Sequence, residues 1–171
     1  MRLLVMLFLA AAMGIGMAAG PVDLPKLVSH NDVVYLAPAR EGWEGLPLGN
    51  GKLGAQVWQP ESGMMFQLNS ALGGVYNGAL ARVRVRTMPE GMSAGMSRYR
   101  QRLSLYDAIL HTEITGNDGV IRTGAFIPAD ADALVVQYEC KRAGVKEAVI
   151  ELDVWRPAAT RTAAGSQLLV T

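Results

Sequence analysis

Beyond residue 50, apolar and polar residues alternate along the chain with the period of two that is typical of strands. The alternation is clearest in residues 149–155, where three apolar side chains share one face and two acidic side chains share the other: Ile150, Leu152 and Val154 against Glu151 and Asp153. A strand with this pattern buries one face and exposes the other. We therefore expect a half-buried strand at 149–155.

Further strand-like runs are separated by turn signals rather than by amphipathic helices, of which the chain after its N-terminal segment shows none. The runs cover residues 82–86, 98–105, 114–121 and 133–140. Within 114–121, Gly116-Asn117-Asp118-Gly119 predicts a hairpin connection. Turn signals recur at 60–63, 73–74, 89–91, 128–130 and 141–144. Many short strands joined by regular turns predict an all-β fold, an antiparallel β-sandwich.

Two of these runs carry arginine at alternate positions, which gives each strand one basic face: Arg82, Arg84 and Arg86, and Arg98, Arg100 and Arg102. Directly opposed like charges destabilise a strand pair. We therefore expect these two strands not to align arginine against arginine, and Glu151 and Asp153 to offset the charge. This pattern favours a salt-bridged sheet face or a docking surface over a site for an anionic ligand.

The N-terminus has the three parts of a secretory signal peptide. A positive start at Arg2 precedes an uncharged apolar stretch over 3–15, and small residues follow at Gly16 and Ala18. We predict a signal peptide at 1–18, a lead-in at 19–29 and the sandwich domain at 30–171. An uncleaved anchor is the alternative, which the short apolar stretch disfavours. The protein is thus expected to be exported to the periplasm or beyond, with no stable membrane span after cleavage.

Composition narrows the possible partners. The chain has 171 residues, a formal net charge of +1 and a single cysteine, Cys140. Its length after signal removal fits one domain, and one cysteine permits no intrachain disulfide. A nearly neutral chain lacks the long-range field that attracts nucleic acid, so nucleic acid is not an expected partner.

Residues Gly49 to Gly54 spell the G-x-G-x-x-G pattern of dinucleotide-binding proteins. That motif functions only where it leaves a buried strand and opens a helix. Here Pro47 precedes it, a strand-like stretch ending at Pro60 follows it, and no carboxylate stands near position 70 to hold a ribose. The pattern therefore predicts a tight turn between two strands and no nucleotide cofactor.

The remaining reactive side chains form no recognisable catalytic or metal motif. His30 and His111 lack the spacing of metal ligands, so we predict no metal site. The run Ser29-His30-Asn31-Asp32 holds the residue types of a triad, but neighbours in sequence do not make one. Carboxylates are plentiful, yet the sequence gives no reason to pair two of them for glycoside hydrolysis: Glu41, Glu44, Asp107, Glu113, Asp118, Asp130 and Asp132.

Four segments nevertheless resemble a known family. Residues 43–55, which begin Trp-Glu-Gly-Leu-Pro-Leu-Gly-Asn-Gly, together with 66–69, 99–108 and 123–130, are similar to the N-terminal domain of glycoside hydrolase family 95. The resemblance covers roughly residues 30 to 171. That family comprises α-L-fucosidases and α-galactosidase-like relatives. The resemblance implies an N-terminal β-sandwich of the super-sandwich type, followed by an (α/α)6 barrel that holds the catalytic carboxylate.

By this resemblance, the chain is the non-catalytic domain of an exported inverting glycoside hydrolase, with no catalytic residue of its own and no cofactor. Its expected partners are a glycan and the downstream barrel, and the sandwich is expected to be incomplete at its C-terminus. Trp43, Asn50 and Asn69, which lie in the matching motifs, are the candidate substrate-binding residues. The stretch after Asn69 departs from the family pattern and leaves the sugar open. The alternative is a stand-alone carbohydrate-binding or structural sandwich without hydrolase activity.

Overall fold

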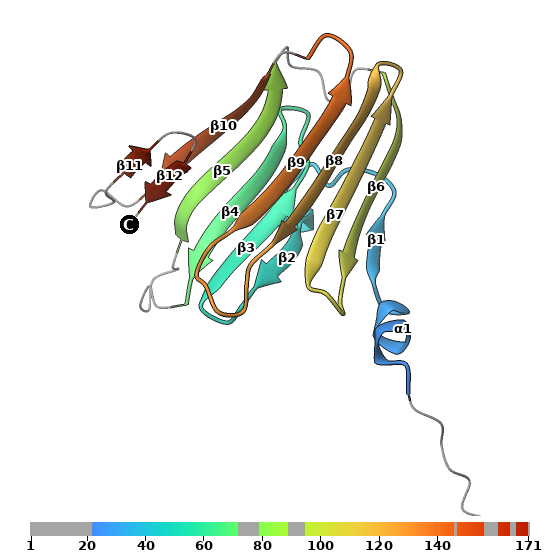
Figure 1. The fold of residues 1–171 in the computed structure, drawn as a ribbon, viewed down its shortest axis with the longest axis vertical. Coiled ribbons are helices and arrows are strands. Elements are labelled where there is room, and N and C mark those ends of the chain that lie inside the picture. Colours follow the sequence, from blue (N-terminus) through green and yellow to red (C-terminus); the bar gives the residue numbers. More distant parts are fainter. Residues whose placement is uncertain are drawn as a thin grey trace, which may run out of the picture.

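Two five-stranded antiparallel sheets form a β-sandwich, which confirms the expected fold class (Figure 1). The computed structural model describes residues 22–71, 79–88, 95–145, 147–155, 161–164 and 167–170. The predicted signal peptide at 1–18 lies outside the described residues, as do the turn signals at 73–74 and 89–91. No helix within the described ranges is long and apolar enough to cross a membrane.

The chain changes sheet after β1, after β5 and again after β9. Sheet A has the order β1 (Val33–Tyr35), β6 (Met96–Ser104), β7 (Ile109–Gly116), β8 (Gly119–Phe126) and β9 (Val135–Arg142). Sheet B has the order β10 (Glu147–Val154), β5 (Ala79–Met88), β4 (Met64–Ser70), β3 (Leu53–Trp58) and β2 (Leu46–Gly49). Two further strands, β11 (Arg161–Ala164) and β12 (Gln167–Val170), pair with each other.

Each expected strand run overlaps a strand of the structure, with ends that differ by a few residues, and the 114–121 run spans the end of β7 and the start of β8. The Gly116–Gly119 segment joins β7 to β8 as a hairpin, with Gly116 paired to Gly119. The alternating 149–155 run lies almost wholly in β10, and the two arginine runs lie in β5 and β6. Because β5 and β6 belong to different sheets, no arginine of one strand is paired with an arginine of the other, as the charge pattern predicted.

One feature was not predicted, a six-residue helix in the lead-in, α1 (Leu24–Ser29). Asp23 caps it, because its carboxylate accepts a hydrogen bond from the Lys26 backbone N–H at 3.1 Å, and a proline lies in the first turn. The helix buries none of its residues. Leu24, Leu27 and Val28 do have helical spacing, but six residues are too few for a hydrophobic period to identify a helix.

The core fills the space between the sheets with side chains from both. Its central members come from strands β2 to β8 and the residue directly after β8, and their burial excludes water from the middle of the sandwich: Leu46, Leu48, Leu53, Ala55, Val57, Met64, Phe66, Val85, Leu103, Leu110, Ala125 and Ile127. A smaller apolar cluster of Tyr99, Ile114 and Ile121 lies further along sheet A. These inward residues alternate with outward ones along each strand, as aligned sheet packing requires.

A polar row separates the two apolar clusters on the inner face of sheet A. Gln101, Thr112 and Thr123 occupy paired positions on three neighbouring strands and are all buried. The Gln101 side-chain amide donates to Thr112 Oγ1 at 3.1 Å, and Thr123 Oγ1 lies 3.6 Å from the sulfur of Met64 on the opposite sheet. Buried hydroxyls and amides are costly unless paired, so this row fixes the register of sheet A.

Strand β10 extends beyond the cover of sheet A. Ile150 is paired with Val85, which is buried in the core, so both side chains point to the inner face. Yet Ile150 is 70 % exposed, whereas Val85 is 3 % exposed. In Figure 1, β10 lies outside β9, the edge strand of sheet A, which explains why the inner face of β10 has little opposite it.

We expect two inward-facing isoleucines to differ sharply in their effect on stability. Ile121→Ala removes a side chain that is 1 % exposed and should lower the free energy of unfolding by about 2–5 kcal/mol. Ile150→Ala should change it by less than about 0.5 kcal/mol, because the side chain is already solvated. Urea unfolding followed by circular dichroism measures both. A large loss for Ile150→Ala would contradict the exposed position of this side chain.

Candidate functional site

The Gly-Asn-Gly segment is a tight turn between β2 and β3, as the sequence predicted. The Asn50 backbone N–H donates to the Leu53 carbonyl at 3.1 Å, and Gly51 has a φ of 90°. This left-handed conformation favours glycine. Strand β3 rather than a helix follows the turn. The geometry therefore lacks the helix N-terminus on which a dinucleotide pyrophosphate would bind.

The Asn50 side chain connects the two sheets. Its amide nitrogen lies 3.0 Å from the Pro128 carbonyl and 3.1 Å from the Ala131 carbonyl, both in the segment between β8 and β9 of sheet A. Its Oδ1 accepts hydrogen bonds from the backbone N–H groups of Lys52 and Leu53, each at 2.9 Å. One side chain thus stabilises its own turn and holds that turn against the opposite sheet. Its predicted contact with substrate stays a prediction.

Trp43 is the most solvent-exposed of the candidate residues. It lies in the short 3-10 helix η1 (Gly42–Glu44) and is 80 % exposed. Beside it is an open cleft of about 430 Å³, lined by Tyr35, Ala37, Pro38, Ala39, Trp43 and Glu44. The hydroxyl of Tyr35 donates to the Glu44 carbonyl at 3.2 Å and fixes one wall. An exposed indole beside a cleft is an arrangement on which a sugar ring can stack.

Asn69 lies at the same end of sheet B as Asn50, and Trp43 lies at the other end. Asn69 is paired with Gly54, next to the β2–β3 turn, at a bulge in the pairing of β4 with β5. Trp43 precedes β2 and Asn50 directly follows it, so the length of that strand separates them. The structure therefore does not gather the three predicted residues into one site.

The carboxylates considered for catalysis serve mainly as structural partners. Glu113 accepts from Arg122 at 2.9 Å, and Asp118 accepts from Arg142 at 2.8 Å. Three more of these carboxylates accept a hydrogen bond. Glu44 accepts one from the backbone N–H of residue 40. Asp107 accepts one from the Ser104 hydroxyl, and Asp132 accepts one from the Asn50 amide. Among the described residues, no group of three or more His, Cys, Asp or Glu side chains is placed to hold a metal ion.

The run around His30 forms no triad, as expected. Asp32 instead accepts from Arg102 Nε at 2.6 Å and from the Leu105 backbone N–H at 2.9 Å. The Leu105 hydrogen bond, assisted by Arg102, holds the pKa of Asp32 below its usual range. The pKa values of Asp118 and Glu139 are also lowered, by hydrogen bonds from Arg142 and Lys141. A general acid needs a raised pKa, so these three carboxylates are unsuited to that role.

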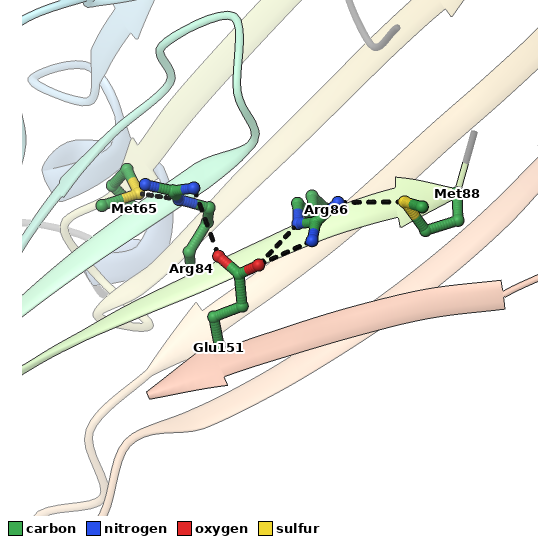
Figure 2. A network of polar contacts seen from close by, with 5 residues as sticks. All are labelled: Met65, Arg84, Arg86, Met88 and Glu151. Atoms are coloured by element: carbon green, nitrogen blue, oxygen red, sulfur yellow. Dashed lines mark hydrogen bonds and ion pairs between the residues drawn. The ribbon is translucent and has the colours of Figure 1, made fainter. Parts of the chain in front are cut away.

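Acidic residues of β10 neutralise the arginine stripe of β5 (Figure 2). Glu151 lies between two of its members: Oε2 is 3.2 Å from Arg84 Nη1, and Oε1 is 2.6 Å from Arg86 Nη2. Each guanidinium also contacts a thioether sulfur, Arg84 that of Met65 at 3.4 Å and Arg86 that of Met88 at 2.9 Å. The predicted salt-bridged face therefore exists on the outer side of sheet B, with the predicted Glu151 in it.

Arg82, the third member of the stripe, has a different environment. Its guanidinium carbon lies 5.8 Å from the ring centre of Trp58 and 5.1 Å from that of Trp155, within the range of cation–π attraction. Asp153 is paired with Arg82 across the strands but accepts a hydrogen bond from the Trp155 indole N–H at 2.9 Å. Sequence analysis did not foresee this cluster, because Trp58 and Trp155 lie almost 100 residues apart.

Comparison with known families assigns the sandwich to a domain family. A family model described as a domain of unknown function, the N-terminal domain of DUF5703, matches residues 34–168. The chain belongs to the DUF5703 N-terminal domain family. The match begins in β1 and ends in β12, so this family is defined over both sheets. A search of curated proteins found no significant match.

The Asn50 contacts predict that the inter-sheet connection can be removed separately from the turn. Asn50→Asp keeps an acceptor for the Lys52 and Leu53 N–H groups but loses the amide donor. It should lower the free energy of unfolding by about 1–3 kcal/mol, because two carbonyls lose their partner and a carboxylate faces Asp132. Chemical unfolding measures the loss. Asn69→Asp is the matched control, and an equal loss in both variants would contradict the assignment.

The lowered pKa of Asp32 predicts acid sensitivity. A carboxyl group with a lowered folded-state pKa contributes stability above its unfolded pKa, and that contribution is lost as the pH falls through the folded value. The melting temperature should therefore fall between about pH 4 and pH 2, and Asp32→Asn should flatten this part of the profile. Thermal melts across that range test it, with Asp130→Asn as control. A profile unchanged by Asp32→Asn would argue against the Asp32–Arg102 contribution.

Proposed function

We propose that this chain is the non-catalytic N-terminal β-sandwich of an exported glycoside hydrolase that acts on terminal sugars of glycans. The proposal rests on the structural role of the segment that resembles glycoside hydrolase family 95. Its Gly-Asn-Gly turn holds the two sheets together through Asn50 and presents no reactive cluster. The motif thus identifies a scaffold domain, and the resemblance to glycoside hydrolase family 95 supplies the class of the parent enzyme.

The arrangement of the carboxylates favours a structural role for this domain over a catalytic one. Glycoside hydrolysis needs an acid and a base at a controlled separation, and the acid needs a raised pKa. Glu113 and Asp118 are each engaged by an arginine. By the resemblance, the catalytic carboxylate belongs to a downstream (α/α)6 barrel, and the reaction would be an α-L-fucosidase-like hydrolysis with inversion. The chain would then position that barrel and require no cofactor.

A second candidate function, a stand-alone carbohydrate-binding module, is favoured by Trp43. This indole is 80 % exposed and borders the open cleft next to Tyr35 and Glu44. Exposed aromatic side chains in a fixed position are a usual means of binding sugars, since the ring covers the apolar face of the sugar. In this function the chain would bind a glycan without any barrel.

Hydrolysis assays separate the proposal from its alternative. The full product of the gene and the chain of 171 residues alone are each incubated with aryl α-L-fucoside and aryl α-galactoside, and aryl alcohol release is measured. We expect release by the full product only, because the described residues of the chain present no acid–base pair. Glycan binding by the chain alone without any hydrolysis by the full product would favour the binding module. Hydrolysis by the chain alone would refute both.

A further inference from the structure

Arg82 stands out because its two stripe neighbours have a carboxylate partner and it does not. Arg84 and Arg86 both contact Glu151. Among the described residues, no carboxylate lies within ion-pair distance of Arg82, and its buried Nε has no hydrogen-bond partner. Its two Nη nitrogens are not among the buried atoms without a partner, and the residue is partly exposed on the outer face of sheet B. A fixed guanidinium with a free edge is a carboxylate-binding group.

Aromatic rings hold this guanidinium in place. Trp58 is 7 % exposed and packs against Ala39 and Met65, so its ring is fixed in the fold. Trp155 is 39 % exposed, and its indole N–H is bonded to Asp153. The first ring anchors the arginine, and the second combines an anchored N–H with a partly exposed face. A sugar ring can pack on that exposed face while its substituent reaches Arg82.

The strands beside Arg82 add polar groups to the same face. Gln67 is paired with Arg82 on one side, and Asp153 is paired with it on the other. Gln67 makes no side-chain hydrogen bond to another residue of the described ranges, and an amide can both donate to and accept from sugar hydroxyls. Three arginines share the outer face of β5, and three acidic residues, Glu147, Glu151 and Asp153, share the corresponding face of β10, so the two strands carry balanced charge. The attraction for an anionic group is therefore local to Arg82.

We propose that the outer face of sheet B binds a carboxylate-bearing sugar, a uronic acid residue of a glycan, with Arg82 as its carboxylate ligand and Trp155 as its stacking surface. The saccharide nature of the ligand rests on the proposed function. The preference for a carboxylate rests on Arg82 alone. Asp153 weakens the attraction by its charge while its oxygen orients the indole.

The probe is a tetramer of galacturonic acid, compared with the same tetramer after reduction of its carboxyl groups. Titration of the full chain is followed by calorimetry and tryptophan fluorescence. We expect the acidic tetramer to bind at least about tenfold more tightly than the reduced one, and added salt to weaken only the acidic complex. Arg82→Gln should remove this preference. Arg82→Lys, which keeps the charge but loses the planar fork, should reduce the affinity about fivefold.

Two further variants test the geometry. Asp153→Asn keeps an acceptor for the Trp155 indole and removes a negative charge, so it should tighten binding of the acidic tetramer about two- to fivefold. Arg100→Gln is the matched control, since Arg100 is an exposed arginine on sheet A, and it should leave the affinity unchanged. Melting curves verify that each variant is folded.

Three outcomes would overturn the inference. Equal binding of both tetramers would exclude the carboxylate preference but leave the proposed carbohydrate function intact. Binding of neither tetramer would exclude a sugar site on this face, and hydrolysis by the full gene product would still decide the proposed function independently. Loss of affinity in Arg100→Gln equal to that in Arg82→Gln would reduce the effect to net charge.

Discussion

Charge repulsion along β5 is the constraint on which much of this sandwich depends. Three arginines project from one face of a single strand, and a strand pair tolerates such a stripe only beside opposite charge. Strand β10 supplies it, with Glu151 opposite Arg84 and Asp153 opposite Arg82. The pairing that neutralises the stripe also places β10 at the edge of sheet B. That position leaves Ile150 on the inner face with little opposite it.

The same pairing divides the outer face of sheet B into two parts. Glu151 contacts Arg84 and Arg86, so that part forms a closed ion-pair network in which the charges are largely satisfied. Asp153 is bonded to Trp155 instead, which leaves Arg82 with aromatic neighbours and, within the described part of the chain, no carboxylate partner. Surface ion pairs contribute little to stability, typically below about 1 kcal/mol. The stripe therefore affects which strand lies beside β5 more than it affects the free energy of folding.

The candidate residues drawn from the family-like motif have separate positions. Asn50 faces inward to the β8–β9 segment, where its amide is fully engaged. Trp43 is exposed beside its own cleft, and Asn69 lies at the far end of sheet B from it. A sequence motif alone does not distinguish residues that bind a ligand from residues that stabilise the fold. Here the hydrogen bonds assign to Asn50 a role in joining the sheets.

The sequence by itself determined the strand-rich class, the hairpin at 116–119, the turn at Asn50 and the mutual avoidance of the two arginine stripes, because each follows from local alternation or local charge. The tertiary structure decided what local pattern cannot encode. Ile121 and Ile150 both face the inner side of their sheets, but only the offset of the sheets buries one and exposes the other. Likewise, the contact of Arg82 with Trp155 depends on a strand pairing across 70 residues of sequence, which no local period reveals.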